Sequence, residues 1–235
     1  DLVHKVYVTS STAGITDGSK LVTNVDLEIG GQLIDRHTAE WMDIVNELTT
    51  TESKSMGVKS MTGAIGISAA ALAGGTIGVG MVQVPLHFWF CRNPGLALPL
   101  IALQYHEVKL KCTWGNTTAL SVGTGAAVQV WCDYIYLDTD ERRRFAQVSH
   151  EYLIEQVQSQ NITAAATSQK LNFNHPVKEL IWTSPAVNTY LNARLSLNGH
   201  DRFAAQEEEY FQLRQPIDHH TAVPKQNLPT VSQLS

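Results

Sequence analysis

Two short segments near the start of the chain alternate between apolar and polar residues. Residues 3–8 are rich in β-branched side chains, and residues 22–29 alternate until they reach Gly30-Gly31. A period of two is typical of a strand with one buried face, and paired glycines are typical of a turn. The pattern therefore predicts two strands, the second of which ends in a turn.

After this turn the period of the apolar residues changes. They recur at spacings of three and four along residues 41–48, which is one face of an amphipathic helix. Asp35 or Thr38 can cap the start of this helix, because either side chain can accept a hydrogen bond from a free backbone N–H.

Residues 82–114 contain the strongest local signals. Residues 82–90 alternate and carry a heavy aromatic face, which predicts a strand, and Asn93-Pro94-Gly95 predicts a tight turn. Pro99 suits the start of a short helix that reaches Leu103. Residues 105–114 alternate again, so this region is expected to run strand, turn, short helix, strand.

The remaining segments of the first 158 residues add two more strands. Residues 128–137 and 152–157 are strand-like, with a polar helical turn at 138–145 between them, while residues 50–81 predict a long surface loop with some helix around 67–72. Six strands and two appreciable helical insertions favour a β-sandwich or barrel.

The second part of the chain repeats features of the first in the same order. Residues 177–182 resemble residues 3–8, and residues 195–199 resemble residues 27–31. Asp201-Arg202 follows the second match as Asp35-Arg36 follows the first, and an acidic segment with aromatic residues comes next in both. The four matches predict an internal duplication with a unit of about 170 residues.

Six strands are too few for an eight-stranded jelly roll, and the second copy stops after about a third of its length. We therefore expect residues 1–160 to form most of a first jelly roll whose first strands are missing. Residues 161–235 would form the start of a second roll, and the chain would be an internal portion of a longer protein.

Composition narrows the function. Hydrophobic residues make up 43% and charged residues 17%, as in a globular protein, and the net charge of −5 with a pI near 6.0 gives no reason to expect contact with nucleic acid. The basic run Arg142-Arg143-Arg144 lies beside acidic residues, which predicts a solvated, salt-bridged face. Neither a signal peptide nor an apolar segment that resembles a membrane span is visible.

Cysteine and histidine spacing does not suggest a metal site. The three cysteines (Cys91, Cys112 and Cys132) are predicted to be buried free thiols within strands, as in a reducing compartment. The nine histidines include no His-x-His pair. His219-His220 beside Asp218 is a tempting set, but neighbours on a strand would point to opposite faces.

Signals for hydrolytic or sugar-binding chemistry are weak in this sequence. Residues 66–70 lack the second glycine of a nucleophile elbow. A pair of catalytic carboxylates stays open, with the following acids as candidates: Glu40, Asp43, Glu107 and Glu151. Trp114 could stack on a sugar or pack at a strand end. Two glycosylation sequons begin at Asn116 and Asn161.

Four long motifs in this order together resemble the major capsid proteins of nucleocytoplasmic large DNA viruses, of the phycodnavirus and iridovirus type. They are VDLEIGGQLIDRHTAEWMDIVNELT, VPLHFWFCRNPGLALPLIALQYHEVKL, CDYIYLDTDERRRFAQVSHEYLIEQVQ and NFNHPVKELIW. The resemblance covers nearly the whole chain apart from residues 10–20, 50–80 and 115–125.

The resemblance implies an all-β double jelly roll, that is, two eight-stranded sandwiches in one polypeptide with short helical insertions. It implies a homotrimer that forms a pseudo-hexagonal capsomer, with neighbouring capsomers and minor capsid proteins as partners in an icosahedral shell. The shell would surround an internal membrane, so no insertion into a membrane and no direct contact with nucleic acid are expected. Assembly would take place in the host cytoplasm, and host glycans are a possible ligand of the outer loops.

We therefore expect a structural protein of the virion that is not an enzyme. No catalytic, cofactor-binding or metal-binding residues are expected, and no cofactor. The alternative is a glycan-binding or hydrolytic jelly-roll module.

Overall fold

The computed structural model describes residues 1–10, 21–62, 82–115, 127–162, 167–183 and 190–224. The chain divides into two compact units. The first consists of Asp1–Asn46 and Thr50–Val157, and the second of Glu47–Thr49 and Gln158–Ser235.

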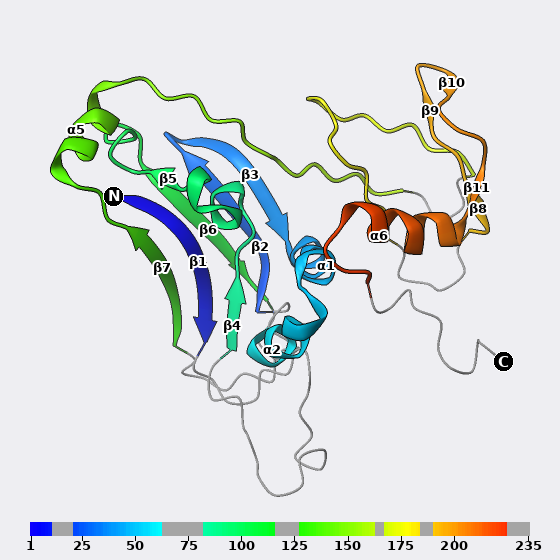
Figure 1. Ribbon diagram of the computed structural model, residues 1–235, viewed down its shortest axis with the longest axis horizontal. Coiled ribbons are helices and arrows are strands. Elements are labelled where there is room, and N and C mark those ends of the chain that lie inside the picture. Colours follow the sequence, from blue (N-terminus) through cyan, green and yellow to red (C-terminus); the bar gives the residue numbers. More distant parts are fainter. Residues whose placement is uncertain (11–20, 63–81, 116–126, 163–166, 184–189, 225–235) are drawn as a thin grey trace, which may run out of the picture. The chain divides into compact units, whose positions relative to one another are not determined.

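One sheet of the first unit is built around β1 (Leu2–Ser10), as Figure 1 shows. β7 (Val128–Ile135) pairs antiparallel with one edge of β1 along its whole length. β4 (Val82–Pro85) and β5 (Leu98–Pro99) pair with successive parts of the other edge. β1 is therefore the central strand, and β7 is an edge strand among the described residues.

The second sheet of this unit has β2 (Val22–Ile29) at its centre, between β3 (Gln32–Thr38) and β6 (Val108–Trp114). All of its pairings are antiparallel. β2 and β3 are joined by Gly30 and Gly31, whose φ angles are 60° and 81°. Two consecutive positive φ angles define a tight hairpin turn that glycine adopts without steric cost.

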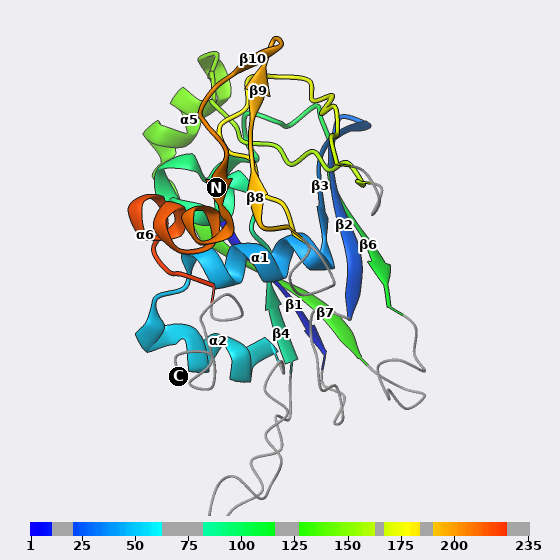
Figure 2. The same cartoon turned by 90° about the vertical axis from the view of Figure 1, so that its right-hand side faces the viewer.

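The two sheets pack face to face as a β-sandwich, and Figure 2 shows the two layers. Apolar side chains from both layers form one cluster, which includes Val6 and Val8 of β1 and Val25 and Leu27 of β2. Phe88 and other aromatic residues fill the space between the layers, with Phe88 fully buried. Burial of these side chains is the main stabilising contribution in such a core.

Short helices connect the strands of the first unit. Their bounds are α1 (Ala39–Thr49), α2 (Glu52–Thr62), α3 (Trp89–Arg92), the 3₁₀ turn η2 (Pro94–Leu96) and α5 (Thr139–Gln147). Thr38 caps α1, because its Oγ1 accepts a hydrogen bond from the backbone N–H of Trp41 at 3.2 Å. Of the two candidate caps, Thr38 is therefore the correct one, while Asp35 lies within β3.

Three sequence-based expectations for the first unit were wrong in detail. The strand predicted over 82–90 ends at Pro85, and residues 89–92 are helical. Pro99 belongs to β5 rather than to a helix, although hydrogen-bonded turns follow it, such as Ala102 N to Pro99 O at 3.1 Å. Residues 52–62 form a helix instead of a loop, and the helix suggested around 67–72 lies outside the described residues.

Residues 151–157 differ from the predicted strand in another way. The segment carries no strand assignment. Single hydrogen bonds attach it to β3, namely Gln156 Nε2 to Ile34 O at 2.5 Å and Val157 N to the Asp35 carboxylate at 2.9 Å. It follows β3 without the continuous backbone ladder that a strand requires.

The second unit contains two small strand pairs and a helical segment. Their bounds are β8 (Asn192–Ala193) with β11 (Gln206–Glu207), β9 (Ser196–Leu197) with β10 (His200–Asp201), η3 (Tyr210–Arg214) and α6 (Gln215–His219). The β9–β10 turn again uses two positive φ angles, 52° at Asn198 and 79° at Gly199. The rings of Trp182 and Phe211 pack edge to face, with centroids 5.0 Å apart.

Candidate functional site

A carboxylate and an imidazole are buried together on the inner face of β3. Asp35 Oδ2 lies 2.8 Å from His37 Nε2, and each side chain is only 1% exposed. Asp35 Oδ1 accepts hydrogen bonds from the backbone N–H groups of Arg36 and Val157, both at 2.9 Å. An Asp-His pair can serve in catalysis, but here no substrate could reach it, and its hydrogen bonds link two parts of the chain.

A second, partly buried histidine lies close to this pair. His87 Nε2 is 2.8 Å from Asn46 Oδ1. Burial, with smaller contributions from His37, Arg92 and Lys5, lowers the pKa of His87 to about 4. His87 is therefore neutral at pH 7 and serves as a hydrogen-bonding partner of Asn46.

The cysteines are poor nucleophiles. Burial raises the pKa of the Cys91 thiol to about 12, and it also raises the pKa values of Cys112 and Cys132. All three are free, but only Cys91 is fully buried, and it lies on α3 rather than on a strand. Since the thiolate is the reactive form, these groups are unreactive at neutral pH.

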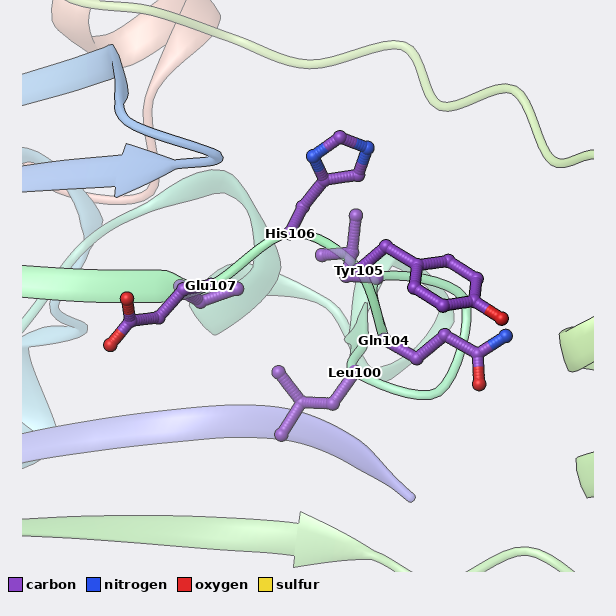
Figure 3. Close-up of a pocket in the computed structure, with 7 residues that line it drawn as sticks. Leu100, Gln104, Tyr105, His106 and Glu107 are labelled. Carbon is purple, nitrogen blue, oxygen red and sulfur yellow. The ribbon is translucent and has the colours of Figure 1, made fainter.

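The segment between β5 and β6 lines a shallow pocket of about 520 Å³. Figure 3 shows that the side chains of Leu100, Tyr105, His106 and Glu107 point in different directions rather than toward a common point. Tyr105 is 88% exposed. Because catalysis requires groups that converge on the reacting atoms, this pocket does not have the form of an active site.

A second cavity of about 580 Å³ lies beside the β2–β3 turn and α5. Its walls include Trp89, Phe145 and Tyr152, together with the rings of His106 and His150. No aspartate, glutamate, lysine or arginine is among the described residues that line it. The cavity therefore lacks a carboxylate pair for glycoside hydrolysis.

His219 and His220, the histidine pair weighed as a metal site, lie at the end of a helix rather than on a strand. His219 is the last residue of the helix α6, so the strand geometry assumed for it was wrong. His220 forms an ion pair with Glu179. Across the described residues, no group of three or more histidine, cysteine, aspartate or glutamate side chains could hold a metal ion.

The four candidate acids occupy surface positions. Glu40 and Asp43 lie on the exposed face of α1, and Glu151 is exposed. Glu107 forms an exposed ion pair with Lys109 at 2.9 Å. Residues 66–70 and Asn116 lie outside the described residues, whereas Asn161 is exposed.

Two other sequence-based predictions concern Trp114 and the arginine run on the surface. Trp114 ends β6 and is 48% exposed, so it is only partly packed. The arginine run forms ion pairs as predicted, with Arg142 2.6 Å from Asp1 and Arg143 3.6 Å from Asp140.

The feature that the sequence did not reveal is the open inner face of β7. Val130 and Tyr134 are 46% and 48% exposed, whereas Val6 and Val8, which lie opposite β7 on β1, are 2% and 0% exposed. Val130 faces Val8 in register and so belongs to the core side of the sheet. Beyond β7, no described strand covers the core side of this sheet. This leaves apolar surface and an unpaired strand edge among the described residues.

Comparison with known proteins places these features in context. The family model described as "Major capsid protein N-terminus" matches residues 3–138, and "Large eukaryotic DNA virus major capsid protein" matches residues 141–190. The chain is 50% identical to the major capsid protein of Pyramimonas orientalis virus, over 100% of this chain and 64% of that protein. It is 35% identical to that of Paramecium bursaria Chlorella virus 1, over 92% of this chain and 62% of the relative.

A solved structure gives the same result for the fold. A quasi-atomic model of the PBCV-1 virus capsid matches with a TM-score of 0.72 and 33% identity, and the match covers 95% of this chain and 68% of that chain. The chain thus spans less than two thirds of the length of these two curated relatives. The matches lend no support to a hydrolytic or glycan-binding module.

Proposed function

Because the chain belongs to the major capsid proteins of large eukaryotic DNA viruses, we propose that it is part of a structural, non-enzymatic subunit of a virus shell. The observation that carries this proposal is the match of two capsid family models in sequence order, over residues 3–138 and 141–190. The fold is that of the double jelly roll. The proposal assigns no catalytic, cofactor-binding or metal-binding residue.

Residues 1–160 are proposed to supply most of the first roll and residues 161–235 the start of the second. Similar hairpins support this division. The β9–β10 turn at Asn198 and Gly199 repeats the two positive φ angles of Gly30 and Gly31. An aspartate follows each turn, and the later one, Asp201, accepts a hydrogen bond from Arg194 at 3.0 Å.

The open edges of the first unit are proposed to hold the first strands of the first roll. β7 forms one edge of the first sheet and β6 one edge of the second among the described residues. One additional strand beside each would pair their free N–H and C=O groups and cover the apolar side chains of β7. Together with the strands described in the first unit, these two strands would complete the roll.

Three copies are proposed to form the capsomer. A trimer that occupies a hexagonal position needs six similar corners, and two similar rolls in each of three subunits supply them. Neighbouring capsomers and minor capsid proteins would be the other partners in the shell. No helix in the described part of the chain has the length and apolar character needed to cross a bilayer.

Assembly is proposed to take place in the host cytoplasm. Cys91, Cys112 and Cys132 are all free thiols, which is consistent with a reducing compartment. Contact of Trp114 with a host glycan stays a prediction, and screening the complete protein and its Trp114→Ala variant on a glycan array tests it.

The first experiment is the mass of the complete protein in solution by light scattering, with negative-stain images of the same peak. A single trimeric species with a hexagonal outline is expected. A stable monomer that forms no larger particle would contradict the capsomer proposal.

A further inference from the structure

Residues 151–157, here called the connecting segment, link α5 to the second unit. They run along β3 with few backbone hydrogen bonds, and the first unit ends at Val157. Contacts that involve side chains must therefore hold this segment in place, because a ladder of backbone pairs is absent from this described stretch.

Several contacts attach the connecting segment to the first unit. Ile154 packs against the apolar core. Glu155 forms an ion pair with Arg92, and the side chains of Glu155 and Arg92 are 39% and 37% exposed. Gln156 Nε2 donates a hydrogen bond to Ile34 O. An exposed ion pair contributes little to stability, since water screens it and ordering two long side chains costs entropy.

The contact at Val157 has a different character. Its N–H donates to Asp35 Oδ1 at 2.9 Å, and the Asp35 side chain is 1% exposed. The backbone N–H of Arg36 also donates to this carboxylate, and His37 Nε2 lies 2.8 Å from Asp35 Oδ2. Both belong to β3 itself, so Val157 supplies the donor that is distant in sequence.

A buried carboxylate that loses one of its donors is left partly unsatisfied in a medium of low dielectric constant, which is costly. Release of the connecting segment would therefore expose or unpair Asp35. The packing of His37 makes rearrangement harder, because its ring stacks on Phe88 at 4.4 Å between centroids and fixes Nε2 toward the carboxylate.

We propose that Asp35, oriented by His37, is a latch that fixes the connecting segment at Val157 and so determines where the chain leaves the first unit. The latch is a conformational device within the first unit. It goes beyond the proposed shell function and does not depend on that function being correct. Thr38, three residues further on, is the N-cap of α1.

The test is hydrogen exchange followed by mass spectrometry on the complete protein, in which the amide of Val157 is compared with amides of β1. In Asp35→Ala we expect exchange at Val157 at least tenfold faster, with the β1 amides unchanged. Cleavage by a glutamate-specific protease after Glu155 should become faster in parallel. Exchange at Val157 as slow as in the wild type would overturn the latch.

Asp26→Asn is the matched control. Asp26 lies on the neighbouring strand β2 and pairs with Arg36 on the solvent side, with Arg36 Nε 2.6 Å from Asp26 Oδ1. Its loss removes an ion pair from the same hairpin but leaves the latch intact, so exchange at Val157 should not change. Equal acceleration in Asp26→Asn and Asp35→Ala would show general loosening of the hairpin and would contradict the proposal.

Should Asp35→Ala fail to fold, two measurements keep the proposal testable. Asp35→Asn retains an oxygen that can accept from Val157 but loses the charge, so intermediate exchange is expected. In the wild type, Val157 should exchange more slowly than Leu153, whose side chain is 91% exposed. Equal rates at Val157 and Leu153 would reject the latch without any variant, and light scattering of the same samples reports separately on the trimer.

Discussion

Phe88 is the aromatic side chain at the centre of the first unit. It is 0% exposed and stacks on both His37 and Phe90, with centroids 4.4 Å and 5.8 Å away. Phe88→Ala should lower the free energy of unfolding by about 3–5 kcal/mol, because the neighbouring rings cannot collapse fully into the cavity. Urea unfolding of the complete protein measures this loss.

Tyr105→Ala is the control for this prediction. Tyr105 is also aromatic but is 88% exposed, so its removal should change the unfolding free energy by less than about 0.5 kcal/mol. Similar losses of unfolding free energy in the two variants would mean that burial of Phe88 is not a main contribution to the stability of the core.

His87 makes the folded state sensitive to acid. Its pKa is about 4 in the folded chain and about 6.5 when unfolded. Below pH 6.5 the unfolded state binds a proton that the folded state does not, so stability falls as the pH drops from 6.5 to 4 and levels off below. The loss amounts to about 3 kcal/mol in total.

Comparison with His87→Gln isolates this contribution. Glutamine can still contact Asn46 but does not titrate, so the variant should lose less stability than the wild type between pH 7 and pH 4.5. His150→Gln, at an exposed position, should follow the wild type. Parallel curves for wild type and His87→Gln would show that His87 does not titrate in this way.

Among the elements, α1 depends on a single capping side chain. Thr38 Oγ1 accepts from Trp41 N, and Thr38→Ala should lower the unfolding free energy by about 1 kcal/mol, whereas Thr38→Ser should retain most of it. Asp138, at the start of α5, makes no side-chain capping hydrogen bond, so Asp138→Ala is the matched control. Thermal unfolding of the complete protein distinguishes them, and equal effects would argue against the cap.

The sequence predicted β1 and β2, whose inner faces are apolar, and missed β3, whose inner face is polar. β1 and β2 alternate clearly, and both were predicted. β3 buries Asp35 and His37, so hydrophobicity gives no period of two there. The partners that make this burial tolerable, among them Val157, lie far away in sequence and leave no local signal.

The prediction of a strand through the region of α3 failed for the opposite reason. Residues 88–91 are all buried, so the apolar run is continuous. A short continuous run fits a buried strand and a buried helix equally well, and alternation before it favoured a strand. In α2 the difficulty was that Thr62 is its only buried residue among those described, which leaves little amphipathic pattern to detect.

At the scale of the molecule, long motifs carried more information than local patterns. The order of four motifs indicated the family, and similar hairpins in the two units are consistent with the predicted duplication. The sites considered for chemistry did not come together, because most of those residues lie at separate surface positions. The open inner face of β7 could not be predicted, since its apolar residues look like those of any half-buried strand.

That open face leads to a final prediction about the complete protein. Val130 is 46% exposed here, so lysine at this position would cost little if the surface stayed open. If additional strands cover it, Val130→Lys buries an unpaired charge and should lower the unfolding free energy by several kcal/mol. Leu33→Lys is the control, because Leu33 is similarly exposed at 50% but lies on β3. A large loss at Val130 alone supports completion of the roll at β7, whereas equal small losses would mean that this face stays open in the complete subunit.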